Sequence, residues 1–348
     1  MFAYKHGTTC KPEVLVRVGV LGVGRIGVHH AETLARHPDV ADLVLADDDA
    51  ERAREVAQRI GCRVVAGVDA AFAVGLDAVV VATPTATHPQ MIIKAAGFGV
   101  PVFCEKPVAD GIPATLEVLA QVEKTGTPVH IGFQRRFDAG YLAAGAALRA
   151  GELGELRRVH LVTADREPPP AQYVANSGGI FRDMHVHDFD ILRAVTGREV
   201  VEVYATGANR GADYFGEAQD IDVSAAVLTL DDGTVATLQG SRYNGAGYDV
   251  RMELGGTKAT WAVGLDDGVP LRSAEPAVDF PAGPSWDGFL RRFAPAYRAE
   301  LGAFLDLARG RITSPCDVRD ALRALYIAEA ADLSRRLHRP VRIDEVQQ

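Results

Sequence analysis

A glycine loop between a strand pattern and a helix pattern is the feature that most limits how this chain folds. An apolar, β-branched run from Val14 to Leu21 leads directly into the sequence GVGRIG, and a helical pattern follows through Ala35. A GxGxxG pattern alone is weak evidence, but here both flanks fit a strand–turn–helix unit that binds a dinucleotide. The helix start would then turn free N–H groups towards phosphates. The predicted cofactor-binding residues of this loop are Gly22, Gly24, Arg25, Ile26 and Gly27.

The rest of the first third alternates between strand and helix patterns. Short buried runs separated by helices predict a parallel sheet covered on both faces, and therefore an α/β fold. The expected strands are 43–46, 64–65, 77–82, 100–104 and 128–133, and the expected helices are 50–60, 91–96 and 112–124.

Asp47 follows the second predicted strand and lies twenty residues beyond Gly27. An acidic residue at this place accepts hydrogen bonds from the adenosine ribose and repels a 2′-phosphate, which favours NAD over NADP. Arg25 is able to reach towards a phosphate, but Asp48 and Asp49 add negative charge, so NAD remains the prediction. The alternative is a tight turn in a doubly wound domain that binds no nucleotide.

Two further loops follow predicted strands, at the edge where such sheets bind ligands. The first, ATPTATH, offers Thr83, Pro84, Thr85 and His88 to the cofactor, although His88 fits a helix-capping role with Thr87 equally well. The second, FCEKP, places Glu105 and Lys106 near the nicotinamide end. A plain salt bridge between these two residues is the alternative.

The segment Ser177–Asp190, SGGIFRDMHVHDFD, carries the densest polar pattern of the chain. If it is helical, Asp183 and His187 lie four residues apart on one face, where a carboxylate holds an imidazole for proton transfer. The same segment also fits a metal site through His185, His187 and Asp190, or a solvated helix end. In a helix, however, His185 and His187 project to different sides.

Composition excludes several classes of protein. The 348 residues suggest about two domains. A net charge of -9 argues against nucleic acid or an anionic membrane as the main partner. The four scattered cysteines show no CxxC spacing, and no run has the apolar length of a signal peptide or membrane span, so a cytoplasmic protein is expected. Residues 1–13 are interpreted as an N-terminal extension.

The order of the motifs along this chain resembles that of the Gfo/Idh/MocA oxidoreductases, and within them most closely that of the inositol 2-dehydrogenases. The motifs are GxGxxG, the strand-end Asp, TPTATH, EKP, GFQRRFD, the DREPPP run and SGGIFRDMHVHDFD. The resemblance runs from about Val16 to the C-terminus. It implies an N-terminal Rossmann NAD-binding domain and a C-terminal α/β domain with a large, mostly antiparallel sheet. That sheet would carry the substrate pocket and build a homotetramer.

The second half of the chain fits this architecture. Boundaries are placed at 14–135 for the Rossmann domain and 136–348 for the substrate-binding and oligomerisation domain. Asp231-Asp232-Gly233 predicts a hairpin turn. The expected strands are 156–163, 200–206, 221–230, 235–241 and 250–254, and the expected helices are 293–307 and 318–337.

By resemblance, Lys106, Asp183 and His187 match the catalytic residues of the family. In an alcohol oxidation His187 would take the hydroxyl proton, Asp183 would orient it, and Lys106 would stabilise the developing alkoxide. The opposite assignment, with neutral Lys106 as the proton acceptor, stays open.

The expected partner is a small cyclic polyol or sugar, most closely myo-inositol. In addition to the catalytic residues, the predicted substrate contacts are Arg136, Asp165, Asp190, Tyr243 and Tyr248. A structural ion pair is the alternative for Arg136, and packing is the alternative for the two tyrosines. His185 is expected to be a specificity residue or a packing residue. Val250 after the GYD stretch and His185 depart from the family pattern, which weakens a claim of strict myo-inositol specificity. Another inositol isomer, another cyclic sugar, and a sugar- or NAD-sensing protein without turnover remain alternatives.

Overall fold

The N-terminal half is a doubly wound domain. The computed structural model describes residues 15–281 and 283–347. Its first sheet has the order β3-β2-β1-β4-β5-β6, and all of its strand pairs are parallel. The strands are β1 (Val16–Leu21), β2 (Val40–Ala46), β3 (Arg63–Val64), β4 (Ala78–Val81), β5 (Val102–Glu105) and β6 (Val129–Gly132).

Helices cover both faces of this sheet, which explains why its central strands are apolar without alternation. Val80 packs with α1 and α2 on one face, whereas Val79 and Val81 pack with α3, α4 and α5 on the other. The helices are α1 (Arg25–Ala35), α2 (Ala50–Ile60), α3 (Val68–Ala73), α4 (His88–Gly97) and α5 (Ile112–Thr125). The short 3₁₀ turns η1 (Thr85–Thr87) and η2 (Gln134–Phe137) follow β4 and β6.

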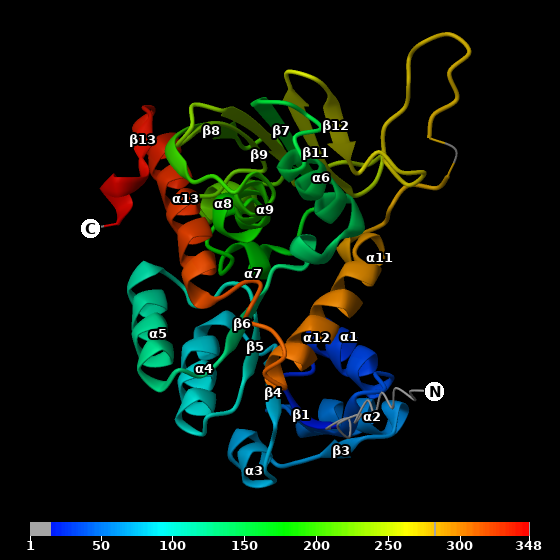
Figure 1. Ribbon diagram of the computed structural model, residues 1–348, viewed down its shortest axis with the longest axis vertical. Coiled ribbons are helices and arrows are strands. Elements are labelled where there is room, and N and C mark those ends of the chain that lie inside the picture. Colours follow the sequence, from blue (N-terminus) through cyan, green and yellow to red (C-terminus); the bar gives the residue numbers. More distant parts are fainter. Residues whose placement is uncertain (1–14, 282, 348) are drawn as a thin grey trace, which may run out of the picture.

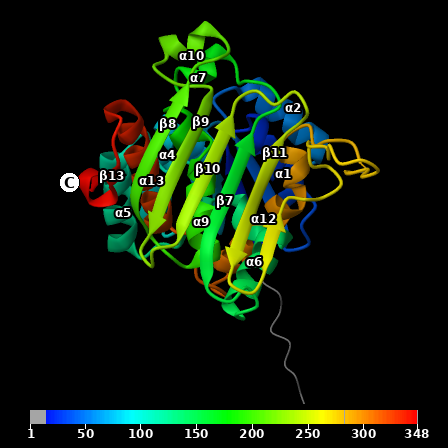
Figure 2. The same cartoon turned by 90° about the horizontal axis from the view of Figure 1, so that it is seen from above.

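The second half forms a seven-stranded sheet with the order β12-β11-β7-β10-β9-β8-β13. Only the β7–β10 pair is parallel, so the sheet is mixed and mostly antiparallel. Figure 2 shows this sheet from above, with its helices behind it. The strands are β7 (Leu156–Ala164), β8 (Val200–Ala208), β9 (Val223–Leu230), β10 (Val235–Ser241), β11 (Asp249–Gly256), β12 (Thr260–Val263) and β13 (Val341–Arg342).

Residues of this sheet alternate between buried and exposed positions, because the described residues cover only one of its faces. The covering helices are α6 (Ala139–Arg149), α8 (Ile180–Asp183), α9 (Val186–Thr196) and α13 (Val318–Leu337). Smaller elements are α7 (Ala171–Val174), α10 (Asp213–Glu217), α11 (Phe289–Arg292) and η3 (Ile343–Val346).

Helix α12 (Ala294–Ala308) returns from the second half to the first (Figure 1). Leu301, Phe304 and Leu305 are fully buried in the same apolar cluster as Val18 and Val20 of β1. The division at residue 135 stays a prediction, but the N-terminal core includes side chains from far beyond it.

Most predicted elements agree with the structure to within a few residues, and α2, β10 and α13 agree at both ends. The predicted hairpin turn joins β9 and β10, with Gly233 in the left-handed region at φ 84°. Elements that the sequence patterns did not predict include α3, α6 and β12 (Thr260–Val263). The predicted extension, residues 1–13, lies outside the described residues. In the described part of the chain, no helix combines the length and apolarity needed to cross a membrane.

Candidate active site

The glycine loop has the geometry that a dinucleotide requires. Gly22 has φ 87°, and a Cβ built there would lie 2.6 Å from the Ala82 carbonyl oxygen. A Cβ on Gly27 would strike the Gly22 carbonyl. At Gly24, by contrast, a Cβ would meet nothing within 4 Å, and no side chain caps the start of α1 behind it. Open space beside free helix N–H groups fits a pyrophosphate.

Asp47 braces this loop. Its carboxylate accepts hydrogen bonds from the amides of Val23 (2.6 Å) and Asp49 (2.8 Å), and from the Arg52 guanidinium (2.6 Å). Burial alone would raise the pKa of Asp47, but these hydrogen bonds hold it below its usual value. The carboxylate is therefore ionised at the strand end where a ribose would bind.

Arg25 and the strand-end loops lie close to this site. The Arg25 guanidinium lies over the ring of Phe289, 5.0 Å from its centre, and so connects the glycine loop to the second half of the chain. The Thr87 hydroxyl donates to Thr83 Oγ1 at 2.7 Å, which orders the loop around Pro84 and Thr85.

His88 and Glu105 bond to other groups of the first half of the chain, and a direct contact of either residue with the cofactor stays a prediction. His88 is 1% exposed, and its ring nitrogens lie 2.7 Å from the Pro107 carbonyl and 2.8 Å from the Thr83 carbonyl. It therefore holds two strand-end loops together. Glu105 pairs with the buried His30 at 2.6 Å instead of with Lys106.

Lys106 crosses from the first half of the chain to Asp183 in the second. Its ammonium donates to the Asp183 backbone carbonyl at 2.8 Å and to Asp183 Oδ1 at 3.1 Å. The side chains of Lys106 and Asp183 are 16% and 11% exposed, so the pair is largely shielded from water. The sequence analysis predicted that these two residues share a site, and the structure brings them together.

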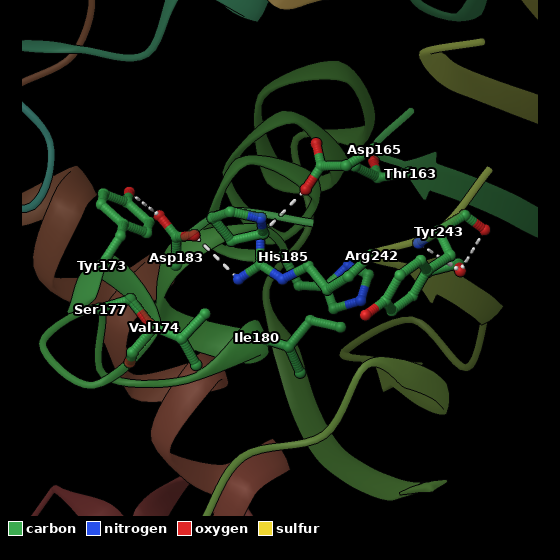
Figure 3. A network of polar contacts seen from close by, with 12 residues as sticks. Thr163, Asp165, Tyr173, Val174, Ser177, Ile180, Asp183, His185, Arg242 and Tyr243 are labelled. Carbon is green, nitrogen blue, oxygen red and sulfur yellow. Dashed lines mark hydrogen bonds and ion pairs between the residues drawn. The ribbon is translucent and has the colours of Figure 1, made fainter. Parts of the chain in front are cut away.

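Asp183 has two further donors (Figure 3). The Tyr173 hydroxyl donates to Oδ1 at 2.7 Å, and the Arg242 guanidinium donates to Oδ2 at 2.8 Å. Burial would raise the pKa of Asp183, but the Lys106 and Arg242 cations and these hydrogen bonds hold it well below its usual value. Asp183 is therefore a fixed anion, and Arg242 also reaches Asp165 Oδ2 at 3.1 Å.

His187 lies in the first turn of α9, beside this cluster. Its ring lies edge-on to Phe133, with the ring centres 5.5 Å apart, and its Nδ1 is buried without a hydrogen-bond partner among the described residues. Burial, then the Lys106 and Arg135 cations, hold its pKa well below 6.5, so the ring is neutral and able to accept a proton.

One part of the predicted relay is wrong. In the described residues Asp183 bonds to Lys106, Tyr173 and Arg242, and no hydrogen bond joins it to His187. The predicted single helix is interrupted between α8 and α9, so Asp183 ends one helix and His187 lies in the first turn of the next.

The predicted substrate contacts Arg136 and Asp190 form a structural ion pair instead. The guanidinium donates to both Asp190 oxygens, at 2.8 and 2.6 Å, and also to the Pro315 carbonyl at 2.6 Å. Asp190 has no exposed surface. Burial raises the pKa of Asp190, and the Arg136 cation opposes this rise without cancelling it.

The two predicted tyrosine contacts differ. Tyr248 is 7% exposed and packs edge-on against Phe293 in the core, which favours the packing alternative. Tyr243 is 40% exposed, and its hydroxyl accepts from the Ala212 amide at 3.1 Å. Tyr243 thus supports a neighbouring loop, and a substrate contact there stays a prediction.

The surroundings of His185 favour the packing role that was one of the two roles expected for it. It is fully buried, 2.8 Å from Asp188 Oδ2 and 2.7 Å from Ser224 Oγ. Asp188 in turn pairs with the buried Arg135 at 2.5 Å. Within residues 15–281 and 283–347, no three His, Cys, Asp or Glu side chains come together as a metal site would require.

Sequence reasoning missed Tyr173, Arg242 and Arg52. Tyr173 follows the proline run, and Arg242 follows β10. Neither residue has a sequence spacing from Asp183 that would predict a contact with it. The pairing of β10 with β7 places Arg242 near Asp165, and the packing of α8 beside these strands brings Asp183 to the same guanidinium.

Comparison with known proteins identifies both halves of the chain. A family model described as an oxidoreductase family with an NAD-binding Rossmann fold matches residues 16–133. A second model, the GFO/IDH/MocA C-terminal domain, matches residues 141–262.

Individual proteins match over nearly the whole chain. The chain is 37% identical to the myo-inositol dehydrogenase Hyg17 of Streptomyces leeuwenhoekii, across 91% of this chain and 97% of that protein. Its fold is similar to a myo-inositol dehydrogenase from Corynebacterium glutamicum, with TM-score 0.87, 35% identity and coverage of 94% and 98%. It is also similar to scyllo-inositol dehydrogenase from Lactobacillus casei with bound NAD(H) and scyllo-inositol, with TM-score 0.85, 26% identity and coverage of 95% and 99%.

Proposed function

The chain belongs to the Gfo/Idh/MocA oxidoreductase family, as an NAD-dependent dehydrogenase acting on CH–OH groups, and we propose that its substrate is myo-inositol. The proposed product is 2-keto-myo-inositol (scyllo-inosose). The observation that carries the proposal is the meeting of Lys106, the ionised Asp183 and the neutral His187 between the nucleotide-binding half and the mixed sheet.

The residues of the first half fit NAD. The space at Gly24 and the uncapped start of α1 would take the pyrophosphate, and Asp47 would accept from the adenosine ribose. Thr83, Pro84 and Thr85, in the loop after β4, would also contact the cofactor. Bound NAD supplies the hydride acceptor, while the protein supplies orientation and proton transfer.

Each of the three side chains then has one task. The Lys106 ammonium donates a hydrogen bond to the reacting oxygen and stabilises charge that develops there. The neutral His187 ring accepts the hydroxyl proton. Asp183 stays ionised and holds Lys106 in place. Neutral Lys106 as the proton acceptor is the competing assignment.

A panel of substrates tests the function. NADH absorbance is followed with myo-, scyllo- and chiro-inositol and with common aldoses. We expect the highest kcat/KM with myo-inositol, because two similar proteins, at 37% and 35% identity, are named for it. A preference for scyllo-inositol, the compound bound in the Lactobacillus casei structure, would change the assigned isomer. No oxidation of any cyclic polyol would refute the proposal.

We also propose a homotetramer built through the outer face of the mixed sheet. This face exposes three large apolar side chains, Tyr204, Val227 and Val235, each between 42% and 44% exposed. Exposed apolar surface of this kind is typical of an interface. Light scattering should give four times the 37.2 kDa chain mass, and a monomer would contradict the proposal.

A further inference from the structure

Arg242 is the buried cation that connects two carboxylates at the candidate site. It follows β10, directly after Ser241, and its side chain is 3% exposed. One end of its guanidinium donates to Asp183 Oδ2 at 2.8 Å and the other to Asp165 Oδ2 at 3.1 Å, as Figure 3 shows. The Nε atom between these ends is buried and has no partner in the described part of the chain.

The two oxygens of Asp183 face different donors. Oδ2 faces Arg242, whereas Oδ1 faces the Lys106 ammonium at 3.1 Å and the Tyr173 hydroxyl at 2.7 Å. A carboxylate at the end of a side chain rotates freely unless its oxygens are held. With Arg242 on Oδ2, only Oδ1 remains for Lys106.

On the basis of the proposed function, we infer that Arg242 is a positioning residue of the dehydrogenase reaction, which acts through Asp183 by fixing its carboxylate so that Oδ1 faces Lys106. Arg242 itself need not touch the substrate. The forked guanidinium of arginine is able to bond to both carboxylates in fixed directions. A lysine ammonium does not fix these directions, because it is a compact point charge.

The charged groups around Arg242 offer a second explanation for any loss of activity in an Arg242 variant. The titratable groups that bond to Asp183 are Lys106, Tyr173 and Arg242, and the charge of Asp183 also acts on Asp165 and on His187. Arg242 also holds Asp165, so a loss of activity in an Arg242 variant has two routes, through Asp183 or through Asp165. Only the first belongs to the inference.

A double-mutant cycle separates these routes. Arg242→Met is made in the wild-type chain and in the Asp183→Asn and Asp165→Asn backgrounds, and kcat and both KM values are measured with myo-inositol and NAD. A misplaced reacting group costs up to about 100-fold, so we expect kcat to fall about 10- to 100-fold in the wild-type background. In the Asp183→Asn background we expect a further fall of less than about threefold, since residues that act as a unit are not additive. The KM for NAD should stay the same.

Two further variants protect the test. Arg242→Lys keeps the charge and should retain more kcat than Arg242→Met, and it serves if the methionine variant does not fold. Arg193→Met is the matched control, because Arg193 is 5% exposed and pairs with Glu199 through two hydrogen bonds of 2.7 and 2.8 Å. It should lower thermal stability and leave kcat unchanged.

The outcomes separate the inference from the function on which it rests. A wild-type chain that oxidises no cyclic polyol rejects the proposed function. An active wild type in which Arg242→Met keeps its kcat overturns the inference alone. Equal losses in the wild-type and Asp183→Asn backgrounds also overturn it, and a loss that disappears only with Asp165→Asn assigns the effect to the other carboxylate.

Discussion

Removing the charge of Asp190 should destabilise the protein without weakening substrate binding. Asp190 has no exposed surface and accepts two hydrogen bonds from Arg136, at 2.6 and 2.8 Å. In Asp190→Asn the guanidinium loses its buried counter-ion. Breaking a buried ion pair in this way typically costs about 3–5 kcal/mol. Arg136 keeps the Pro315 carbonyl at 2.6 Å and Asp320 at 3.2 Å, so we expect the lower end, about 3 kcal/mol.

Thermal unfolding measures this loss. With an unfolding entropy of about 2.1 cal/mol/K per residue, the 348 residues give about 0.7 kcal/mol/K, so the midpoint of Asp190→Asn should fall by about 4 °C. The double variant Arg136→Met/Asp190→Leu removes both charges, and it should lose less stability than the single variant. The KM of the folded single variant for myo-inositol should match that of the wild type. An unchanged midpoint together with a tenfold higher KM would refute the structural role and restore the predicted substrate contact.

Three further outcomes test the site. His187→Ala should lower kcat by about two to four orders of magnitude while NAD binding, followed by fluorescence, persists; near-normal turnover would refute the assignment of the base. Because burial and the nearby Lys106 cation hold the pKa of His187 below 6.5, the acid limb of the wild-type kcat–pH profile should lie below pH 6.5, and a limb at or above that value contradicts this. Gly27→Ala should abolish NAD binding because its Cβ would strike the Gly22 carbonyl, whereas Gly97→Ala, with nothing within 4 Å of its Cβ, should bind normally; equal affinities would contradict the packing argument.

The sequence predicted the fold well where local patterns decide the structure. The apolar strand before the glycine loop, the helix at α2 and the DDG turn each depend on neighbours along the chain. Family resemblance also predicted that Lys106 meets Asp183. The short helix α3 and the small β12 strand escaped detection because their patterns are too brief to show a period.

Partner choice among charged residues could not be predicted in the same way. Arg136, Asp190 and Tyr248 looked like polar contacts for a polyol, but burial turned the first two into an ion pair and the third into a core residue. Conversely, Arg242 gave no sequence signal. Which charges meet depends on how β7, β10 and the α8–α9 turn pack together, and no spacing along the chain encodes this.

The return of α12 to the first sheet has a consequence for synthesis on the ribosome. The chain emerges from its N-terminus, so β1 forms long before Leu301, Phe304 and Leu305 are available to cover Val18 and Val20. Until then one face of the nucleotide-binding sheet stays partly bare, and a fragment ending near residue 135 would keep that face bare permanently. The nucleotide-binding half is therefore completed late, when the nascent chain has passed residue 308.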